Sequence, residues 1–200
     1  MTEPTNKLLS FYGKHIDEHG SGPRAVGWGS SGSQKVRFKE LCEIGDLNNC
    51  SVLDVGCGLG DLYTYLFERY DGMEYTGIDI NPRYVERARE AHHEAHFEVA
   101  DFGTYEGKKF DYVLASGAFS VKIPNYREVY FKNIKKMFAM ARKGVAFNML
   151  DKEHHPDDES YAAYAVAEVR NFCLSFADNV IIRHDYLPHD FTVILKRHSS

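Results

Sequence analysis

The stretch VLDVGCGLGD, residues 52–61, decides the fold of this 200-residue sequence. A short apolar run with the character of a strand leads directly into three glycines at alternate positions, and a helical pattern follows at once. Glycines in such a place permit a tight turn, and they let a ligand approach the backbone at the N-terminus of a helix. The stretch therefore predicts a strand, a turn and a helix, with room for a ligand at the turn.

A second motif, GIDINP at residues 77–82, places an acid where the next strand ends. A carboxylate at that position can accept hydrogen bonds from both hydroxyls of a ribose. Pro82 suits the first turn of the helix that follows. A glycine-rich turn by itself is compatible with a structural turn that binds nothing, but the turn together with Asp79 favours a nucleoside site.

The spacing of the glycines separates two kinds of nucleoside ligand. A dinucleotide site uses GxGxxG, in which the third glycine lets the helix pack closely beneath a pyrophosphate. This chain has GxGxG and carries Asp61 at that position. A carboxylate there would repel a pyrophosphate, whereas Asp54 and Asp61 are compatible with a ligand that bears a sulfonium and an ammonium group. The pattern favours S-adenosylmethionine (SAM) over a nicotinamide dinucleotide.

Beyond residue 51 the sequence alternates between strand-like and helical patterns. The expected strands are residues 51–55, 74–79, 96–100, 110–116 and 144–150, and the expected helices between them are about 60–70, 82–93 and 126–142. Such alternation predicts a parallel sheet covered on both faces, and right-handed crossovers place the carboxyl ends of its strands at one edge. Two final runs, 179–185 and 190–196, are joined by too short a connection for a crossover, so they predict an antiparallel hairpin.

Helical patterns also occur outside this alternating region. A short aromatic stretch around residues 11–15 and an apolar stripe over residues 161–176 are both expected to be helical. Another helix is expected over residues 33–47, with Ser33 as its N-cap.

The composition restricts the class of protein. Hydrophobic residues make up 44% and charged residues 26%, and 200 residues suit a single domain. No apolar run approaches the roughly 20 residues that span a bilayer, and the sequence does not open with a secretory signal pattern. The four cysteines form no CxxC pair, which argues against a zinc site and is typical of the reducing cytosol. Since the net charge is −5, nucleic acid is disfavoured as a partner. We expect a cytoplasmic monomer or homodimer without a metal.

Residues 51–150 resemble the core of the class I SAM-dependent methyltransferases. The resemblance is carried by VLDVGCGLGD and GIDINP, and by FEVADF at residues 97–102 and FDYVLASGAF at residues 110–119. It implies a Rossmann-like α/β fold, a three-layer αβα sandwich with a mostly parallel seven-stranded sheet in the order 3-2-1-4-5-7-6 and an antiparallel C-terminal hairpin. It also implies one domain over residues 1–200, with an N-terminal lid at 1–33 and a SAM-binding core at 34–200, and S-adenosylhomocysteine (SAH) as product.

The resemblance assigns cofactor-binding roles to residues at the strand ends. The glycines would line the cofactor, Asp79 would hold the ribose, and Asp54 would orient the amino group of the methionine part. Asp101 would face the adenine amino group and Phe102 would border the ring. Arg37 either pairs with the cofactor carboxylate or is a surface arginine, and Trp28 either caps the pocket or packs on the sheet. The full expected set is Trp28, Arg37, Asp54, Gly56, Gly58, Gly60, Asp79, Ile80, Asp101, Phe102 and Ser116.

The acceptor is expected at the same edge of the sheet, because ligands of open α/β sheets bind outside the carboxyl ends of the strands. Phe119, Asn148 and Tyr186 are the candidates on the acceptor side. Methyl transfer is an in-line displacement that needs a general base only when the nucleophile is neutral or a protonated amine. Candidates for such a catalytic group are His189, His154, His155 and Tyr12, and each histidine is also readily explained as a surface residue.

No Asn/Asp-Pro-Pro-Tyr/Phe motif follows the fourth strand, where the sequence reads SGAF at residues 116–119. This lowers the expectation of methylation at the exocyclic amine of a base or at a glutamine amide. No appended RNA-binding module is evident. We expect a methyltransferase with a small-molecule acceptor, with an enzyme acting on RNA or protein, or a non-catalytic SAM-binding regulatory domain, as the alternatives.

Overall fold

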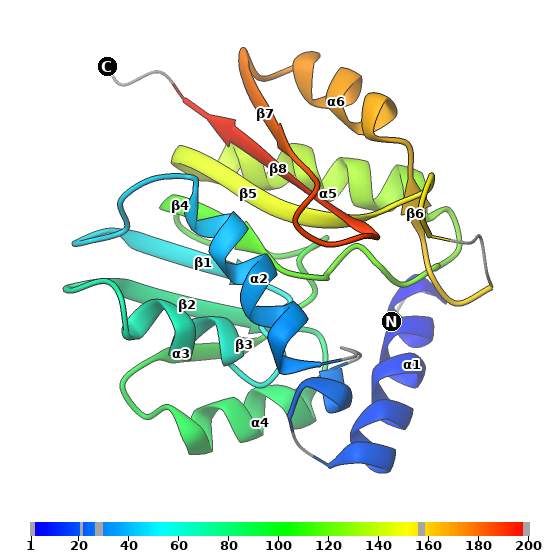
Figure 1. The fold of residues 1–200 in the computed structure, drawn as a ribbon. Helices are drawn as coiled ribbons and strands as arrows, with labels where there is room; N and C mark the ends of the chain where they lie inside the picture. The colour runs from blue at the N-terminus through cyan, green and yellow to red at the C-terminus, as the bar shows by residue number, and fades with distance from the viewer. Residues whose placement is uncertain (1–2, 21, 27–29, 156–158, 198–200) are drawn as a thin grey trace.

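The protein is described by a computed structural model over residues 3–20, 22–26, 30–155 and 159–197, in which strands and helices alternate along most of the chain (Figure 1). The helices are α1 (Glu3–His19), η1 (Pro23–Val26), α2 (Ser31–Cys42), α3 (Asp61–Phe67), α4 (Pro82–Ala91), α5 (Tyr126–Met140) and α6 (Val166–Leu174). The strands are β1 (Ser51–Val55), β2 (Glu74–Asp79), β3 (His96–Val99), β4 (Phe110–Ala115), β5 (Ala141–Asp151), β6 (Ala163–Tyr164), β7 (Asn179–Arg183) and β8 (Asp190–Lys196).

The strands form one sheet in the order β3-β2-β1-β4-β5-β8-β7. The first five of these pair in parallel, while β8 runs antiparallel to both β5 and β7. The expected order 3-2-1-4-5-7-6 and the C-terminal hairpin are therefore confirmed. The numbers of the last two strands are shifted because an additional two-residue strand, β6, pairs in parallel with the end of β5.

Strand β6 corrects the expected helix over residues 161–176. Ala163 and Tyr164 pair with Leu150 and Asp151, and α6 begins only at Val166. Both side chains are buried. Their apolar character therefore matched the spacing expected for a helix, although the backbone at these two residues is a strand. Two residues are too short to display the alternation that identifies a strand.

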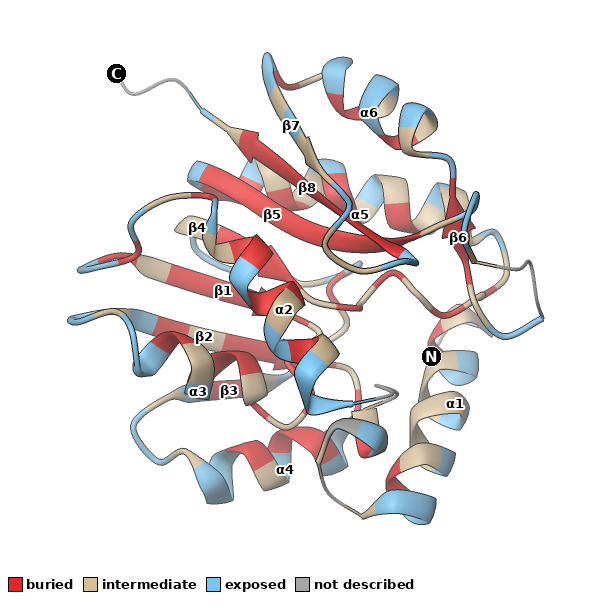
Figure 2. Cartoon of the chain, viewed as in Figure 1, coloured by how far each residue is buried: buried red, intermediate tan, exposed pale blue. Residues whose placement is uncertain are grey.

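Two apolar layers cover the sheet, one on each face. Adjacent residues of β1 point to opposite layers: Val52 packs with α2, α3 and α4, whereas Leu53 packs with α5 and α6. Val113 and Leu114 of β4 alternate in the same way. Figure 2 shows the central strands buried along their length while the outward faces of the helices are exposed. The burial on both faces explains why these strands read as continuous apolar runs.

The N-terminal helices differ from expectation in their bounds. Helix α1 is 17 residues long, extending well beyond the aromatic stretch around residues 11–15. The N-cap of α2 is Ser30, whose hydroxyl oxygen accepts a hydrogen bond from the backbone N–H of Ser33, so the expected cap at Ser33 is wrong by three residues. The sequence offers three serines at this point, and any of them could serve as a cap. Trp28 lies outside the described residues. Within the described ranges, none of the helices has the length and apolar character to cross a membrane.

Candidate functional site

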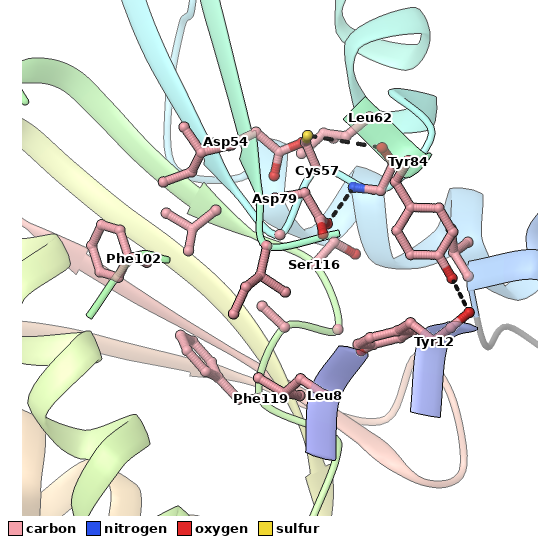
Figure 3. A pocket seen from close by; sticks show the side chains of 18 of the residues that line it. Leu8, Tyr12, Asp54, Cys57, Leu62, Asp79, Tyr84, Phe102, Ser116 and Phe119 are labelled. Atoms are coloured by element: carbon pink, nitrogen blue, oxygen red, sulfur yellow. Dashed lines mark hydrogen bonds between the residues drawn. The ribbon is translucent and has the colours of Figure 1, made fainter. Parts of the chain in front are cut away.

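A pocket lies at the carboxyl ends of β1, β2, β3 and β4, and residues of α1 form part of its wall (Figure 3). Its wall includes the glycine turn, the residues that follow each of these strands, and side chains from α1, α2, α4 and α5. The four carboxylates in the wall are Asp54, Asp61, Asp79 and Asp101. This is the edge at which open α/β sheets bind their ligands.

The glycine turn that follows β1 requires glycine for two physical reasons. Gly56 and Gly58 have φ angles of +78° and +54°, which disfavour any residue with a side chain. A Cβ atom on Gly56 would lie 3.0 Å from the Cβ of Ala118, and one on Gly58 would lie 3.0 Å from a methyl of Val26. The turn therefore exposes backbone to the pocket at the start of α3, where the N–H groups of a helix are unpaired.

Asp79, at the end of β2, is bonded directly to this turn. One of its carboxylate oxygens accepts a hydrogen bond from the N–H of Gly58 at 2.9 Å, and the other accepts from the N–H of Asn81 at 2.8 Å. Figure 3 shows Asp79 at the centre of the pocket with the bond to the turn. Burial raises its pKa to about 6, although the backbone hydrogen bonds act in the opposite direction. The carboxylate thus joins the ends of two adjacent strands and faces the pocket.

Asp54 is the most deeply buried of the four carboxylates, with a relative exposure of 1%. One oxygen accepts a hydrogen bond from the hydroxyl of Tyr75 at 2.6 Å. The other, Oδ1, has no hydrogen-bond partner among the described residues. Burial raises the pKa of Asp54 to about 7, the bond from Tyr75 lowers it, and the nearby carboxylates of Asp79 and Asp61 raise it. A buried acceptor without a donor is costly, so this atom suits a donor supplied by a ligand.

The other wall of the pocket follows β3. Asp101 accepts hydrogen bonds from the N–H of Gly103 at 2.9 Å and from the hydroxyl of Thr5 on α1 at 3.0 Å. Phe102 is buried beside it and lines the pocket. Ile80 and Ser116 line the pocket as well.

Most residues expected at the cofactor are therefore brought together, with three exceptions. Gly60 is the N-cap of α3 and is absent from the pocket wall, since it faces the rings of His92 and Phe97. Arg37 is also absent from the described pocket wall, and its side chain pairs with Asp190. Trp28 cannot be placed, because it lies outside the described residues.

Arg37 pairs with a carboxylate of its own chain. Its guanidinium donates two hydrogen bonds to Asp190 on β8, one of them at 2.9 Å, and both side chains are almost completely buried. Arg37 is therefore buried and is not a surface arginine, and its role at a cofactor carboxylate stays a prediction. The sequence could not reveal the pair with Asp190, because the partner lies 153 positions away.

The three candidate histidines lie together, but outside the pocket wall. His154 contacts Asp151 at 2.9 Å, the Nδ1 of His189 lies 2.6 Å from the carbonyl oxygen of His154, and the rings of His155 and His189 are 6.0 Å apart. The bond to Asp151 raises the pKa of His154. Ligand atoms of Asp151, Glu153 and His154 lie within 4.8 Å of one another at this surface. Of the four catalytic candidates, only Tyr12 lines the pocket.

Of the three candidates on the acceptor side, one lines the pocket and two do not. Phe119 is buried in the pocket wall. Asn148 is not part of the wall, but its side-chain oxygen accepts a hydrogen bond from the N–H of Gly117 at 3.0 Å and so supports the loop after β4. Tyr186 is bonded to Thr192 at 2.8 Å, away from the pocket.

Helices supply pocket residues that the sequence did not identify. They are Leu8 of α1, Gln34 and Phe38 of α2, Leu62 of α3, Tyr84 of α4, and Tyr130 and Asn133 of α5. Gln34 donates a hydrogen bond to Asp61 at 2.9 Å, and Tyr130 donates one to the carbonyl of Val121 at 2.7 Å. Tyr130 belonged to the apolar stripe of its helix, which is a signal of burial and not of a pocket.

Comparison with known proteins agrees with this geometry. A family model described as "Methyltransferase domain" matches residues 46–179. A Mycobacterium tuberculosis protein with the name "Putative methyltransferase Rv1506c" is 31% identical over 160 residues, covering 74% of this chain and 94% of that protein. The malonyl-[acyl-carrier protein] O-methyltransferase of Acetivibrio thermocellus is 35% identical over 92 residues, covering 43% of this chain and 32% of the relative.

Solved structures share the fold at low sequence identity. Magnesium protoporphyrin IX methyltransferase from Synechocystis, solved with bound SAM, superposes with a TM-score of 0.72 at 17% identity, and 99% of each chain is covered. The 1,6-didemethyltoxoflavin-N1-methyltransferase of Burkholderia thailandensis, solved with bound 1,6-didemethyltoxoflavin and SAH, gives a TM-score of 0.67 at 15% identity, covering 100% of this chain and 92% of the other. At these identities the likeness concerns the fold.

Proposed function

This chain belongs to the methyltransferase-domain family, and from that membership we propose that it transfers the methyl group of SAM to a small-molecule acceptor. The observation that carries the proposal is the pair formed by Asp79 and the glycine turn at the carboxyl edge of the sheet. That pair supports a nucleoside site, and solved neighbours of the same fold contain SAM or SAH.

The residues of the pocket fit this cofactor. Gly56 and Gly58 have positive φ angles that favour glycine, and both line the pocket, so a ligand there can lie against backbone. Asp79 would hold the ribose hydroxyls, and Asp101 with Phe102 would hold the adenine. The buried Oδ1 of Asp54 lacks a donor among the described residues, and the ammonium group of the methionine part would supply one.

The bound cofactor supplies an electrophilic methyl group on a sulfonium. The task of the protein is then to align the acceptor with that methyl and to exclude water. Leu8 and Tyr12 of α1, together with Phe119, give the pocket an apolar wall opposite Asp79 (Figure 3). Burial raises the pKa of Tyr12 well above its ordinary value of 10, so its phenol stays protonated near neutral pH. Tyr12 is suited to donating a hydrogen bond and not to removing a proton.

We also propose that residues 34–200 form the cofactor-binding core and that the N-terminal segment acts as its lid. Side chains of both α1 and η1 reach the pocket, through Leu8, Tyr12 and Val26. Arg83 of α4 pairs with Asp17 of α1 at 2.7 Å. The lid would thereby shield the reacting atoms from solvent.

The acceptor is proposed to be small and at least partly aromatic. The wall formed by Leu8, Phe119 and Tyr130 offers apolar and aromatic contacts, and the described residues of the wall include no basic side chain that would bind a phosphate backbone. A neighbour with this fold contains bound 1,6-didemethyltoxoflavin beside SAH, which is consistent with the proposal.

Calorimetric titration of SAM and SAH tests the proposed function. We expect both to bind, and we expect Asp79→Ala to weaken SAH binding by roughly 10-fold or more, because charged hydrogen bonds to the ribose are lost. Asp71→Ala, at an exposed position outside the pocket, serves as the matched control. The protein is then incubated with SAM and a panel of small-molecule acceptors, and release of SAH is measured to detect turnover. Absence of binding by either nucleoside would refute the proposal, and binding without turnover across a broad panel would favour a regulatory SAM-binding domain.

A further inference from the structure

Helix α5 presents a row of side chains to the end of the pocket that follows β3. Tyr130, Asn133 and Lys136 are spaced three residues apart, so each is a neighbour of the next on the helix surface. Tyr130 and Asn133 line the pocket, and so do Asp101 and Phe102. The row therefore lies along the segment where the base of the cofactor is proposed to bind.

Two hydrogen-bonded neighbours on α5 hold Asn133 in place. The hydroxyl of Tyr130 donates to a backbone carbonyl of the loop after β4 at 2.7 Å. The ammonium of Lys136 donates to the carbonyl oxygens of Phe102 and Gly103, at 2.7 and 3.1 Å, and lies 5.1 Å from the centre of the Phe102 ring. The helix is thus fastened to the pocket about one turn before and one turn after Asn133.

The amide of Asn133 lies near the carboxylate of Asp101. A Cβ atom on Gly103 would be 3.1 Å from Oδ1 of Asp101 and 3.9 Å from the side-chain oxygen of Asn133, so both groups lie on the same side of this segment. Among the residues that the structure describes, none forms a hydrogen bond with the half-buried amide of Asn133. An amide in a pocket wall has both a donor and an acceptor to offer to a ligand.

Adenine presents the groups that such an amide can pair with. Its exocyclic amine is a donor and its N7 is an acceptor on the same edge, and an asparagine amide can accept from the first while it donates to the second. The amine has two hydrogens, so a carboxylate and an amide can each accept one of them. Asp101 and Asn133 supply these two acceptors from neighbouring positions in the wall.

We propose that Asn133 is a base-recognition residue, whose amide binds the amine and N7 of the adenine while Asp101 accepts the other hydrogen of the amine. The inference rests on the proposed function, and it adds a residue of α5 to the strand-end motifs that the resemblance assigns to the cofactor. A residue that only packs against the base could be replaced by an apolar side chain of similar size. A residue that reads the base could not.

Calorimetric titrations with two ligands test the inference. One ligand is SAH, and the other is its deaza analogue, in which a C–H group replaces N7 and the amine is kept. We expect the unmodified protein to bind the analogue roughly 10-fold more weakly than SAH, because the amide donor is left without its partner. Asn133→Leu retains a side chain of similar size without the amide. It should bind SAH roughly 10-fold or more weakly than the unmodified protein, and it should bind the two ligands within about threefold of each other.

A control and a second variant make the result specific. Asn171→Leu, at an exposed position of α6, should bind both ligands as the unmodified protein does. Asn133→Asp retains the shape of the side chain but lacks the donor, so it should also lose the preference for SAH, and it replaces Asn133→Leu if thermal unfolding shows that the leucine variant is not folded.

Three results decide the matter. Unchanged SAH affinity in a folded Asn133 variant, or a preference for SAH over the deaza analogue that persists there, would overturn the inference and leave the proposed function intact. Equal binding of the two ligands by the unmodified protein would overturn it as well. If neither ligand binds the unmodified protein, the proposed function fails and the inference fails with it.

Discussion

The buried hydroxyl of Tyr84 on α4 lies 3.1 Å from the backbone carbonyl oxygen of Tyr12 on α1. The same hydroxyl also contacts the carbonyl oxygen of Ala25 in η1. The phenol of Tyr84 on α4 therefore joins both α1 and η1, and Figure 3 shows its contact with Tyr12. Tyr12 and Tyr84 both line the pocket, so this contact joins α1 to α4 at the pocket wall.

Removal of that hydroxyl should loosen the N-terminal segment. Tyr84→Phe removes the one hydroxyl donor that the carbonyls of Tyr12 and Ala25 share, and we expect a loss of about 1–3 kcal/mol in the free energy of unfolding. Limited proteolysis should cut within residues 1–33 sooner than in the unmodified protein. Tyr105→Phe, at a half-buried tyrosine that is not part of the pocket wall, is the control. Unchanged proteolysis and stability in Tyr84→Phe would show that the hydroxyl does not hold the segment.

The glycine turn should tolerate no side chain at Gly58. Gly58→Ala forces a residue with a Cβ into a φ of +54° and brings that Cβ to 3.0 Å from Val26. We expect a loss of about 1–2 kcal/mol in unfolding free energy, measured by chemical denaturation, from the backbone strain alone. Gly32→Ala is the matched control, because Gly32 lies in α2 and the nearest atom to its Cβ would be 3.8 Å away. The control should be neutral or stabilising by up to about 1 kcal/mol.

The affinity for SAH should increase with pH through neutrality. The pKa of Asp54 is raised by burial to about 7, so the folded protein holds this proton at pH values where the unfolded chain has released it. Asp54 therefore lowers the stability of the free protein as pH rises from about 4 to about 7. Binding of an ammonium group requires the ionised form, so affinity should rise about tenfold between about pH 6 and about pH 8.

Calorimetry across this range measures the dependence, and Asp54→Asn should abolish most of it. The same variant should raise the stability of the free protein more at about pH 8 than at about pH 5. At the higher pH the buried carboxyl of Asp54 is ionised, so the variant removes a buried charge there, whereas at the lower pH the carboxyl is already neutral. The carboxyl of Asp79, with a pKa of about 6, also titrates at the lower end of this range, and its contribution is present in both proteins. Equal SAH affinity at both ends of the range would argue that Asp54 does not bind the ammonium.

Methyl transfer should not depend on the three histidines of the β5 and β8 ends. The triple variant His154→Ala, His155→Ala and His189→Ala removes every imidazole of that cluster, which lies outside the pocket wall. Turnover with an acceptor found in the screen should stay within about twofold, since the loss of a catalytic base costs about 10²-fold or more. A loss of turnover of about 10²-fold or more would instead show that one of these histidines is catalytic, as the sequence suggested.

Much of the fold follows from local patterns in the sequence. Residues 52–61 encode a strand, a turn and a helix through the spacing of apolar residues and glycines, and Asp79 marks the next strand end. The handedness of crossovers then places these ends at one edge without further information. The short link between β7 and β8 leaves only an antiparallel hairpin. By contrast, the two-residue strand β6 carries no pattern of its own and depends on the neighbouring end of β5.

The candidate site also has a part that the sequence predicts and a part that only the tertiary structure shows. The residues that follow β1, β2 and β3 were predictable, because each lies at a strand end whose position the topology determines. The partner of Arg37 was not, since the sequence shows a cation and an anion 153 positions apart but not that α2 packs on β8. The contribution of α1, through Leu8 and Tyr12, likewise depends on how a helix docks on the edge of the sheet. Spacing along the chain specifies backbone direction, whereas pairing and docking depend on side chains that meet only after the chain has folded.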